Sequence, residues 1–240
     1  IGFIVWDDVA RNKWHFKRYL LHSKIVLTVT FLLTVIGTVL FLLTENNAAF
    51  AGMSPLEKVL GALFSAVTPR TAGFNSVDTA ALSNSGKLIT MVMMFVGGSP
   101  GSTAGGVKTT SVIVLLFYAG AMVLNKEDIN LFGRRLTDEV VKKANAVVII
   151  NATLTIVATV IIMALQPLLN FEDVLFEVLS AIGTVGMTVG ITRDLDIIAR
   201  VILIVLMYCG RLGSLSFALV FAQKNTSAPM RQPQEKIIVG

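Results

Sequence analysis

The chain has 240 residues, of which 54% are hydrophobic and only 15% are charged, and its formal net charge is +5. Soluble domains usually carry about 25% charged residues, so the composition excludes most soluble proteins and indicates an integral membrane protein. The high apolar content also excludes an intrinsically disordered chain, and the single cysteine excludes a disulfide-stapled fold.

The basic residues lie at the edges of apolar runs. Residues 11–24, 124–143 and 223–240 hold five, five and three of the 20 lysines and arginines, and the positive-inside rule predicts that these segments are cytoplasmic. The chain begins within an apolar phrase, without a signal peptide pattern, which suggests a fragment of a longer chain. We therefore expect residues 1–20 to hold the inner end of a preceding membrane helix and a cytoplasmic linker.

Several apolar runs are long enough to cross a bilayer, which takes about 20 residues. Residues 25–44 and 144–171 are uncharged, and residues 201–222 contain one arginine, Arg211. The run 88–123 is too long for one crossing and contains GGSPGSTAGG at 97–106. Glycine and proline at this density cannot continue a helix, so we expect this span to break inside the membrane.

Two shorter apolar runs, 59–69 and 178–192, lie between the spans, and runs of this length are typical of re-entrant segments. The order of span, half-helix and span therefore occurs twice. We expect one unit at 21–123, a second at 144–222, a cytoplasmic linker at 124–143 and a cytoplasmic tail at 223–240.

The two units also match as sequences. EKVL followed by SAV in 57–67 matches EDVL followed by SAI in 172–182 at an offset of 115, and TAGF at 71–74 matches TVGM at 184–187 at an offset of 113. Both copies run from inside to outside and back, so the repeat is parallel. A half-helix that ends in such glycine-containing segments can turn carbonyls toward a cation, although a loop used only for packing is the alternative.

Phrases from nearly the whole chain carry a resemblance to one family. They are VTPRTAGFNSVD at 67–78, GGSPGSTAGGVKTT at 97–110, SAIGTVGMTVGIT at 180–192, GRLGSLSF at 210–217 and EKIIVG at 235–240. The sequence resembles the Ktr/Trk/HKT potassium-transporter superfamily, and most nearly its bacterial KtrB-type membrane subunit. The resemblance implies an all-α integral membrane protein of the bacterial plasma membrane, with two parallel membrane-pore-membrane repeats and re-entrant pore helices. These are the third and fourth of four channel-like repeats.

The resemblance also implies roles for individual residues. The selectivity filter would take its carbonyls from Thr71, Ala72, Gly73, Thr184, Val185 and Gly186. The intramembrane gate loop would contain Gly97, Gly98, Ser99, Pro100, Gly101, Ser102, Gly105 and Gly106, with Arg211 facing it from the last helix. The implied function is potassium uptake by a protein that is not an enzyme and has no cofactor. The sequence leaves sodium coupling open.

Physical reasoning about Arg211 supports the role that the resemblance implies for it. A guanidinium at mid-membrane costs at least about 2.5–3.5 kcal/mol, so it needs buried acceptors. The carbonyls freed by the broken helix at 97–106 are the expected acceptors, and the hypothesis is that Arg211 binds this loop and raises a barrier to cations. A purely structural arginine is the alternative.

Other charged groups have plainer interpretations. Glu172, Asp173 and Glu177 cluster where the second half-helix is expected to start, and stabilising a helix N-terminus is favoured over collecting cations at a mouth. His15 and His22 have no cysteines or paired carboxylates at ligand spacing, so a bound metal is not expected.

Two other functions remain open, namely an alternating-access cation carrier and a non-conducting membrane scaffold. As partners, the resemblance implies a second copy of the chain in a homodimer and a cytosolic ring of nucleotide-binding regulatory subunits, and the basic linker suits membrane lipids. Nucleic acid is not expected. The apolar tail 237–240 is expected to dock at the dimer interface.

Overall fold

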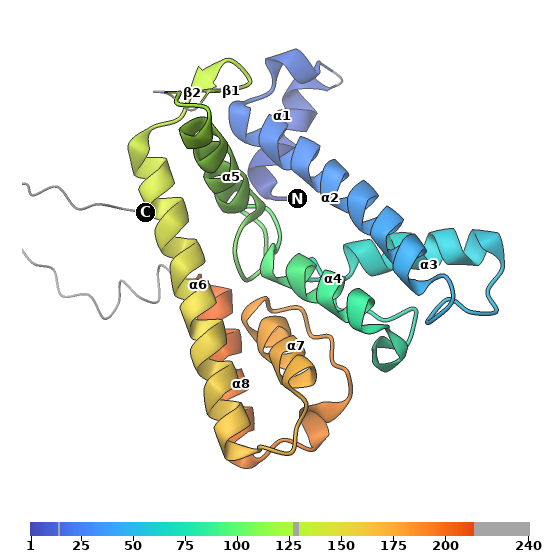
Figure 1. Ribbon diagram of the computed structural model, residues 1–240. Helices are drawn as coiled ribbons and strands as arrows, with labels where there is room; N and C mark the ends of the chain where they lie inside the picture. The colour runs from blue at the N-terminus through green and yellow to red at the C-terminus, as the bar shows by residue number, and fades with distance from the viewer. Residues whose placement is uncertain (14, 127–129, 214–240) are drawn as a thin grey trace, which may run out of the picture.

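The computed structural model describes residues 1–13, 15–126 and 130–213, and this part of the chain is mostly helical (Figure 1). The expected docking of the tail 237–240 lies outside the described residues, as do 214–222 of the last expected span. The helices are α1 (Phe3–Asn12), α2 (Leu21–Glu45), α3 (Pro55–Val67), α4 (Asn84–Phe95), α5 (Thr109–Val123), α6 (Asp138–Leu165), α7 (Phe171–Ile182) and α8 (Ile197–Leu212).

Two helices, α2 and α6, are long and apolar enough to cross a membrane, and α5 is a shorter apolar helix. Only 28% of the most apolar part of each long helix is buried within the chain. Large side chains such as Phe31 and Leu43 on α2 point outward, as they do in helices that face lipid.

Helix α6 differs from the expected span at both ends. It begins at Asp138, inside the expected linker 124–143, and it ends at Leu165 rather than continuing to 171. Pro167 explains the early end, because proline lacks a backbone N–H and disfavours a helical residue before it. The remaining linker contains an unexpected hairpin of β1 (Asn130–Leu131) and β2 (Arg134–Arg135).

The short helices α3 and α7 occupy equivalent places in the two units. They end at Val67 and Ile182, which are 115 positions apart, the offset at which their sequences match. Both begin earlier than their apolar runs, since polar residues form their first turns. Ser54 and Glu57 make a capping box that satisfies backbone N–H groups at the start of α3.

The ends of α2 and α6 are also connected alike to the helices that follow, through different side chains. Glu45, at the end of α2, is fully buried and accepts a 3.2 Å hydrogen bond from the backbone N–H of Ser83, which caps α4. Gln166, after α6, accepts a 3.0 Å bond from the backbone N–H of Asp196, which precedes α8. Ser83 and Asp196 are 113 positions apart, so the connection repeats with the filter phrases.

The run 88–123 is interrupted, since α4 ends at Phe95 and α5 begins at Thr109, while the expected position of the break inside the membrane stays a prediction. The segment between them folds back on itself through hydrogen bonds from Gly97 N to Val107 O, at 2.9 Å, and from Thr109 N to Gly98 O, at 3.1 Å. In Figure 1 it forms a loop near the centre of the molecule.

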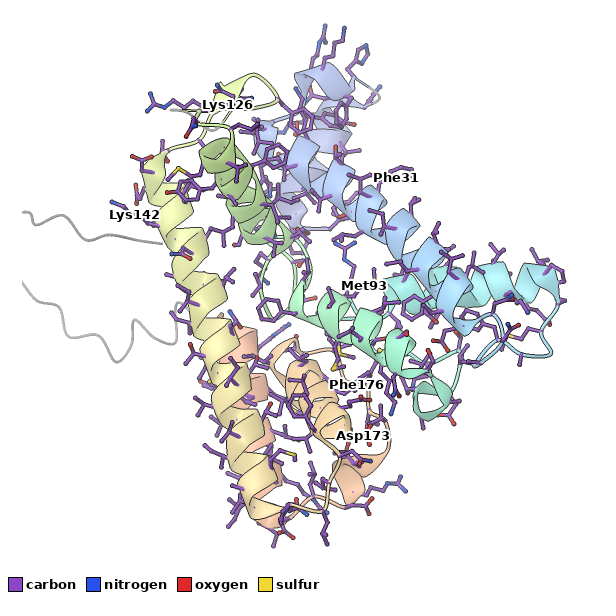
Figure 2. The ribbon with its side chains drawn as sticks, viewed as in Figure 1. Phe31, Met93, Lys126, Lys142, Asp173 and Phe176 are labelled. Carbon is purple, nitrogen blue, oxygen red and sulfur yellow. The ribbon has the colours of Figure 1, made fainter. Side chains whose placement is uncertain are left out.

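Helices α4 and α7 join the two units. Met91 and Met94 of α4 pack with Phe176 and Leu179 of α7 in one apolar cluster. Beside it, Lys87 of α4 and Asp173 of α7 form an ion pair at 2.9 Å, with both side chains 15% exposed (Figure 2). This contact holds α4 of the first unit against α7 of the second.

Candidate functional site

The two segments expected to line a filter, Thr71–Gly73 and Thr184–Gly186, follow directly after α3 and α7. They share an unusual backbone. The φ angles are +70° and +53° at the threonines and +73° and +87° at the glycines, whereas the middle residues have ordinary negative values. A positive φ is rare for a β-branched residue. Such alternation turns successive carbonyls to one side, as a carbonyl-lined ion site needs.

The two segments approach each other closely. A Cβ atom on Gly73 would lie 2.1 Å from the carbonyl oxygen of Val185, so only glycine fits there. That carbonyl faces the first segment, while the side chain of Val185 is 5% exposed and packs in the cluster between α4 and α7. Val185 therefore presents its carbonyl to the first segment and its side chain to the core.

Each segment is held by the end of its own short helix. In the first unit, the carbonyl of Thr68 accepts from Ala72 N at 3.0 Å and from Gly73 N at 3.2 Å. In the second unit, Val185 N donates to Ser180 O at 2.9 Å. The C-terminal end of a helix carries partial negative charge, so both helices favour a cation near these segments.

The loop at 97–106 touches the second segment. The backbone N–H of Gly105 donates a 2.9 Å hydrogen bond to the hydroxyl of Thr184. A Cβ atom on Gly105 would lie 2.5 Å from the same oxygen, so the absence of a side chain permits this approach. The expected gate loop and half of the expected filter are thus in direct contact.

The rest of the loop is compact. The Ser102 hydroxyl donates to the carbonyl of Ser99 at 2.6 Å, and Lys108 Nζ donates to the carbonyl of Ala104. At the tip, the carbonyl of Gly101 accepts from Phe3 N at 3.3 Å, which connects the loop to the start of α1. The structure therefore gathers all the expected loop residues into one folded element.

Arg211 reaches this loop from α8, where its guanidinium donates to the carbonyl of Thr103. The predicted hydrogen bond between Arg211 and the loop is confirmed, while its role in gating stays a prediction. The neighbouring Gly210 lies against the end of α7, since a Cβ there would be 2.0 Å from Ile182 O. This packing brings Arg211 to the loop.

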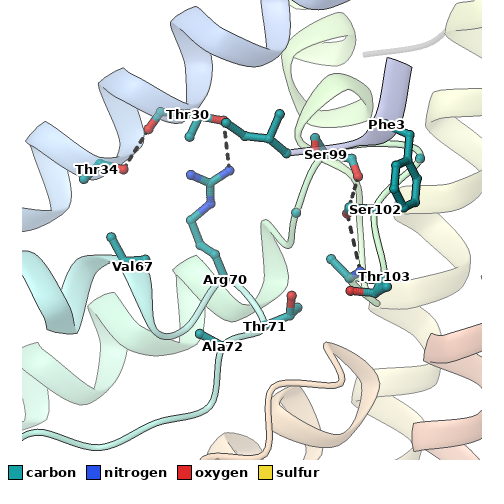
Figure 3. Close-up of a pocket in the computed structure, with 14 residues that line it drawn as sticks. Phe3, Thr30, Thr34, Val67, Arg70, Thr71, Ala72, Ser99, Ser102 and Thr103 are labelled. Carbon is teal, nitrogen blue, oxygen red and sulfur yellow. Dashed lines mark hydrogen bonds between the residues drawn. The ribbon is translucent and has the colours of Figure 1, made fainter. Parts of the chain in front are cut away.

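A cavity of about 500 Å³ separates the loop from the first segment (Figure 3). Arg70, Thr71 and Ala72 line one side, and Ser99, Ser102 and Thr103 line the other. Thr30 and Thr34 of α2 close it from a third direction. The loop thus contacts the second filter segment but is separated from the first by a space with many hydroxyl and carbonyl groups.

Arg70 is a lining residue that the sequence interpretation missed. Its guanidinium extends from the start of the first segment to α2 and donates to the Thr30 hydroxyl at 3.3 Å (Figure 3). The sequence shows Pro69 and Arg70 only as an insertion relative to the second unit. The available signal was that Arg70 is the only charged residue between Lys58 and Asp78.

Glu177 corrects a second interpretation. Glu172 and Asp173 lie in the first turn of α7 as expected, but Glu177 lies in the middle of the helix and is 5% exposed. Its carboxylate accepts hydrogen bonds from the hydroxyls of Thr188 and Thr192. It therefore neither caps the helix nor lies at an open mouth.

Comparison with known proteins gives a consistent picture. The chain is 38% identical over 246 residues to the "Potassium/sodium uptake protein NtpJ" of Enterococcus hirae, and the match covers the entire chain and 54% of that protein. It is 35% identical over 242 residues to the "Ktr system potassium uptake protein B" of Bacillus subtilis, with coverage of 100% and 54%. The chain thus spans about half the length of these relatives.

A solved structure shows the same fold. The potassium transporter TrkH from Vibrio parahaemolyticus matches with a TM-score of 0.72 and 21% identity, over 93% of this chain and 49% of that one. A family model described as "Cation transport protein" matches residues 15–231. The resemblance seen in the sequence phrases is therefore confirmed, and the chain belongs to the TrkH family of membrane cation transporters, which are not enzymes.

Proposed function

We propose that this chain forms half of a potassium uptake pathway across the bacterial plasma membrane. The observation that carries the proposal is the pair of filter segments, whose backbones alternate in handedness and approach until Gly73 meets the Val185 carbonyl. Carbonyl oxygens that replace the hydration shell of an ion are the basis of potassium selectivity. Potassium as the substrate follows from the names of the relatives.

The proposed architecture has two parallel membrane-pore-membrane repeats, one made of α2, α3 and the broken pair α4 and α5, and one made of α6, α7 and α8. In each, the short helix enters and leaves on the outer face. The helix ends repeat at an offset of 115 and the residues Ser83 and Asp196 at an offset of 113, the two offsets at which the sequence phrases match, and this supports the arrangement. Coverage of about half of each relative fits the third and fourth of four repeats.

The loop at 97–106 is the proposed gate. Irregular backbone inside a membrane persists only where it is buried in protein or lines water, and this loop has both protein contacts and a cavity beside it. In the proposed closed state, Arg211 and Thr184 hold it beneath the second segment. The positive charge of Arg211 then raises the barrier to cations.

We also propose that the complete protein is a homodimer and that it sits on a cytosolic ring of nucleotide-binding regulatory subunits. The basic residues of the linker 124–143 suit contacts with such subunits or with anionic lipid. The name of the relative NtpJ favours a test of sodium together with potassium.

The deciding experiment is potassium uptake by bacteria that lack their own uptake systems and express the full-length protein, with and without Gly186→Ser. Gly52→Ser is the matched control, since both glycines have positive φ, +87° and +80°, and open space for a side chain. Uptake that Gly186→Ser abolishes or opens to sodium, and that Gly52→Ser leaves intact, supports the proposal.

Equal uptake by all three proteins would place the pathway elsewhere. Uptake by none of them would favour the scaffold. Recordings from the purified protein would distinguish a pore from an alternating-access carrier. A pore gives single-channel currents, and an alternating-access carrier does not.

A further inference from the structure

A buried carboxylate lies directly behind the second filter segment. Glu177 is in the middle of α7, seven residues before Thr184, and its side chain is sheltered from solvent. One carboxylate oxygen accepts from the Thr188 hydroxyl, and the other accepts from the Thr192 hydroxyl at 2.9 Å. A buried carboxylate is stable only when it has hydrogen-bond partners, so these two bonds fix the positions of Thr188 and Thr192.

The threonines belong to the segment that follows Gly186, with Thr188 in irregular backbone and Thr192 in a short 3-10 helix at Ile191–Arg193. Their hydroxyls lie 2.8 Å apart, and the Thr188 hydroxyl also accepts from Gly190 N at 2.9 Å. The carboxylate therefore ties residues 188–192, as one hydrogen-bonded turn, to the middle of α7.

This attachment leaves only a short stretch between two fixed points. At its inner end, Thr184 is bonded to Gly105 of the loop, and at its outer end Thr188 is bonded to Glu177. Between them, the side chains of Val185 and Met187 are buried in the cluster between α4 and α7. The positions of the intervening carbonyls are thus determined by the two anchors and by this packing.

The first unit has no equivalent carboxylate. The residue 115 positions before Glu177 is Ala62, which is fully buried. The residues 113 positions before the two threonines are Asn75 and Thr79, and they bond to each other at 3.1 Å. Thr68 instead holds the first segment by donating to Phe74 O at 2.6 Å.

We propose that Glu177 is a positioning residue for ion selectivity, whose carboxylate fixes the outer end of the second segment and so sets the spacing of the carbonyls that an ion meets. The inference rests on the proposed function. Discrimination between potassium and sodium depends on the number and spacing of coordinating carbonyls, so loosening one anchor changes selectivity before it changes the fold.

The test uses the full-length protein in liposomes, with uptake of radioactive rubidium as a potassium substitute and sodium as competitor. Glu177→Ala removes two hydrogen bonds to a charged carboxylate, and the loss of either one is worth about tenfold or more, so the preference for rubidium over sodium is expected to fall at least that much. The preference of Glu177→Gln should lie between those of the unaltered protein and of Glu177→Ala, because its amide oxygen can still accept one hydrogen bond from a threonine hydroxyl. Glu172→Gln, an exposed change on the same helix, should match the unaltered protein.

The possible outcomes separate the two proposals. Unaltered protein that takes up no rubidium would overturn the proposed function. Unaltered protein that is selective, with Glu177→Ala equally selective, would overturn the positioning role alone. If Glu177→Ala does not fold, Glu177→Gln and Thr192→Val decide the matter, because each removes part of the same attachment. Full selectivity in both would overturn the inference.

Discussion

The backbone N–H of Gly105 and the side-chain hydroxyl of Thr184 are joined by a 2.9 Å hydrogen bond, across 79 positions of sequence. The bond connects the interrupted helix of one unit with the filter segment of the other. A movement of either element therefore displaces the other, because Gly105 has no side chain to separate them.

Replacing Thr184 with valine is expected to raise the basal leak of potassium severalfold. Valine has nearly the shape of threonine and the same branching at Cβ, but it leaves the N–H of Gly105 without its acceptor, which costs about 1–3 kcal/mol. Flux into liposomes measures the effect. Thr184→Ser keeps the hydroxyl and should stay near the unaltered rate, and equal leak in both variants would show that the bond does not restrain the loop.

Replacing Gly73 with alanine is expected to abolish selective uptake. The left-handed conformation costs a non-glycine residue about 1–2 kcal/mol, and overlap of the new Cβ with Val185 O adds about 1–3 kcal/mol. Gly52→Ala carries only the first cost, because its φ is +80° and no atom lies within 4 Å. Selectivity measured in parallel should fail only in Gly73→Ala, and equal behaviour of the two variants would show that the contact with Val185 is unimportant.

Replacing Arg211 with alanine is expected to speed cation entry by a factor on the order of ten, since a hydrogen bond to a charged group is worth about 1.5–3 kcal/mol. The Thr103 carbonyl would lose its partner and the pathway would lose a fixed positive charge. Arg211→Lys keeps the charge and should show a smaller change. Uptake rates and cation preference that are the same in all three proteins would leave Arg211 a structural residue only.

Replacing Lys87 with alanine is expected to lower stability by about 1–3 kcal/mol, because it leaves the largely buried carboxylate of Asp173 without its partner. Thermal unfolding in detergent measures the loss. Lys143→Ala breaks the exposed pair with Glu139 and should leave the stability nearly unchanged, because water screens that pair. Exchanging the charges of Lys87 and Asp173 should restore part of the stability. Full restoration is not expected, because Asp173 also favours the N-terminus of α7.

The sequence predicts the features that depend on local chemistry. Glycine and proline break the helix between Phe95 and Thr109, and a matching phrase ends α3 and α7 at equivalent residues. The contact between Arg211 and the loop could be predicted from hydrogen-bonding requirements. A guanidinium expected at mid-membrane requires acceptors, and the broken helix supplies them.

The features that escaped prediction depend on partners brought together by the fold. In the sequence Glu177 resembles a helix-capping residue, and only the fold brings Thr188 and Thr192 alongside its carboxylate. The contacts of Arg70 could not be predicted, because only the fold brings it to Thr30, 40 residues earlier, and to a cavity whose opposite wall is the loop. The early end of α6 is different, because Pro167 is visible in the sequence and its tendency to end a helix is a local property.

The two filter segments are held by unlike chemistry, a threonine bonded to a backbone carbonyl in one and a carboxylate bonded to two hydroxyls in the other. In a ring of identical subunits, every mutation appears in all positions at once. Here a mutation at Glu177 has no counterpart at Ala62, so each segment is free to change on its own. Under the proposed function, evolution can then adjust ion preference in small steps, by altering one segment while the other stays unchanged.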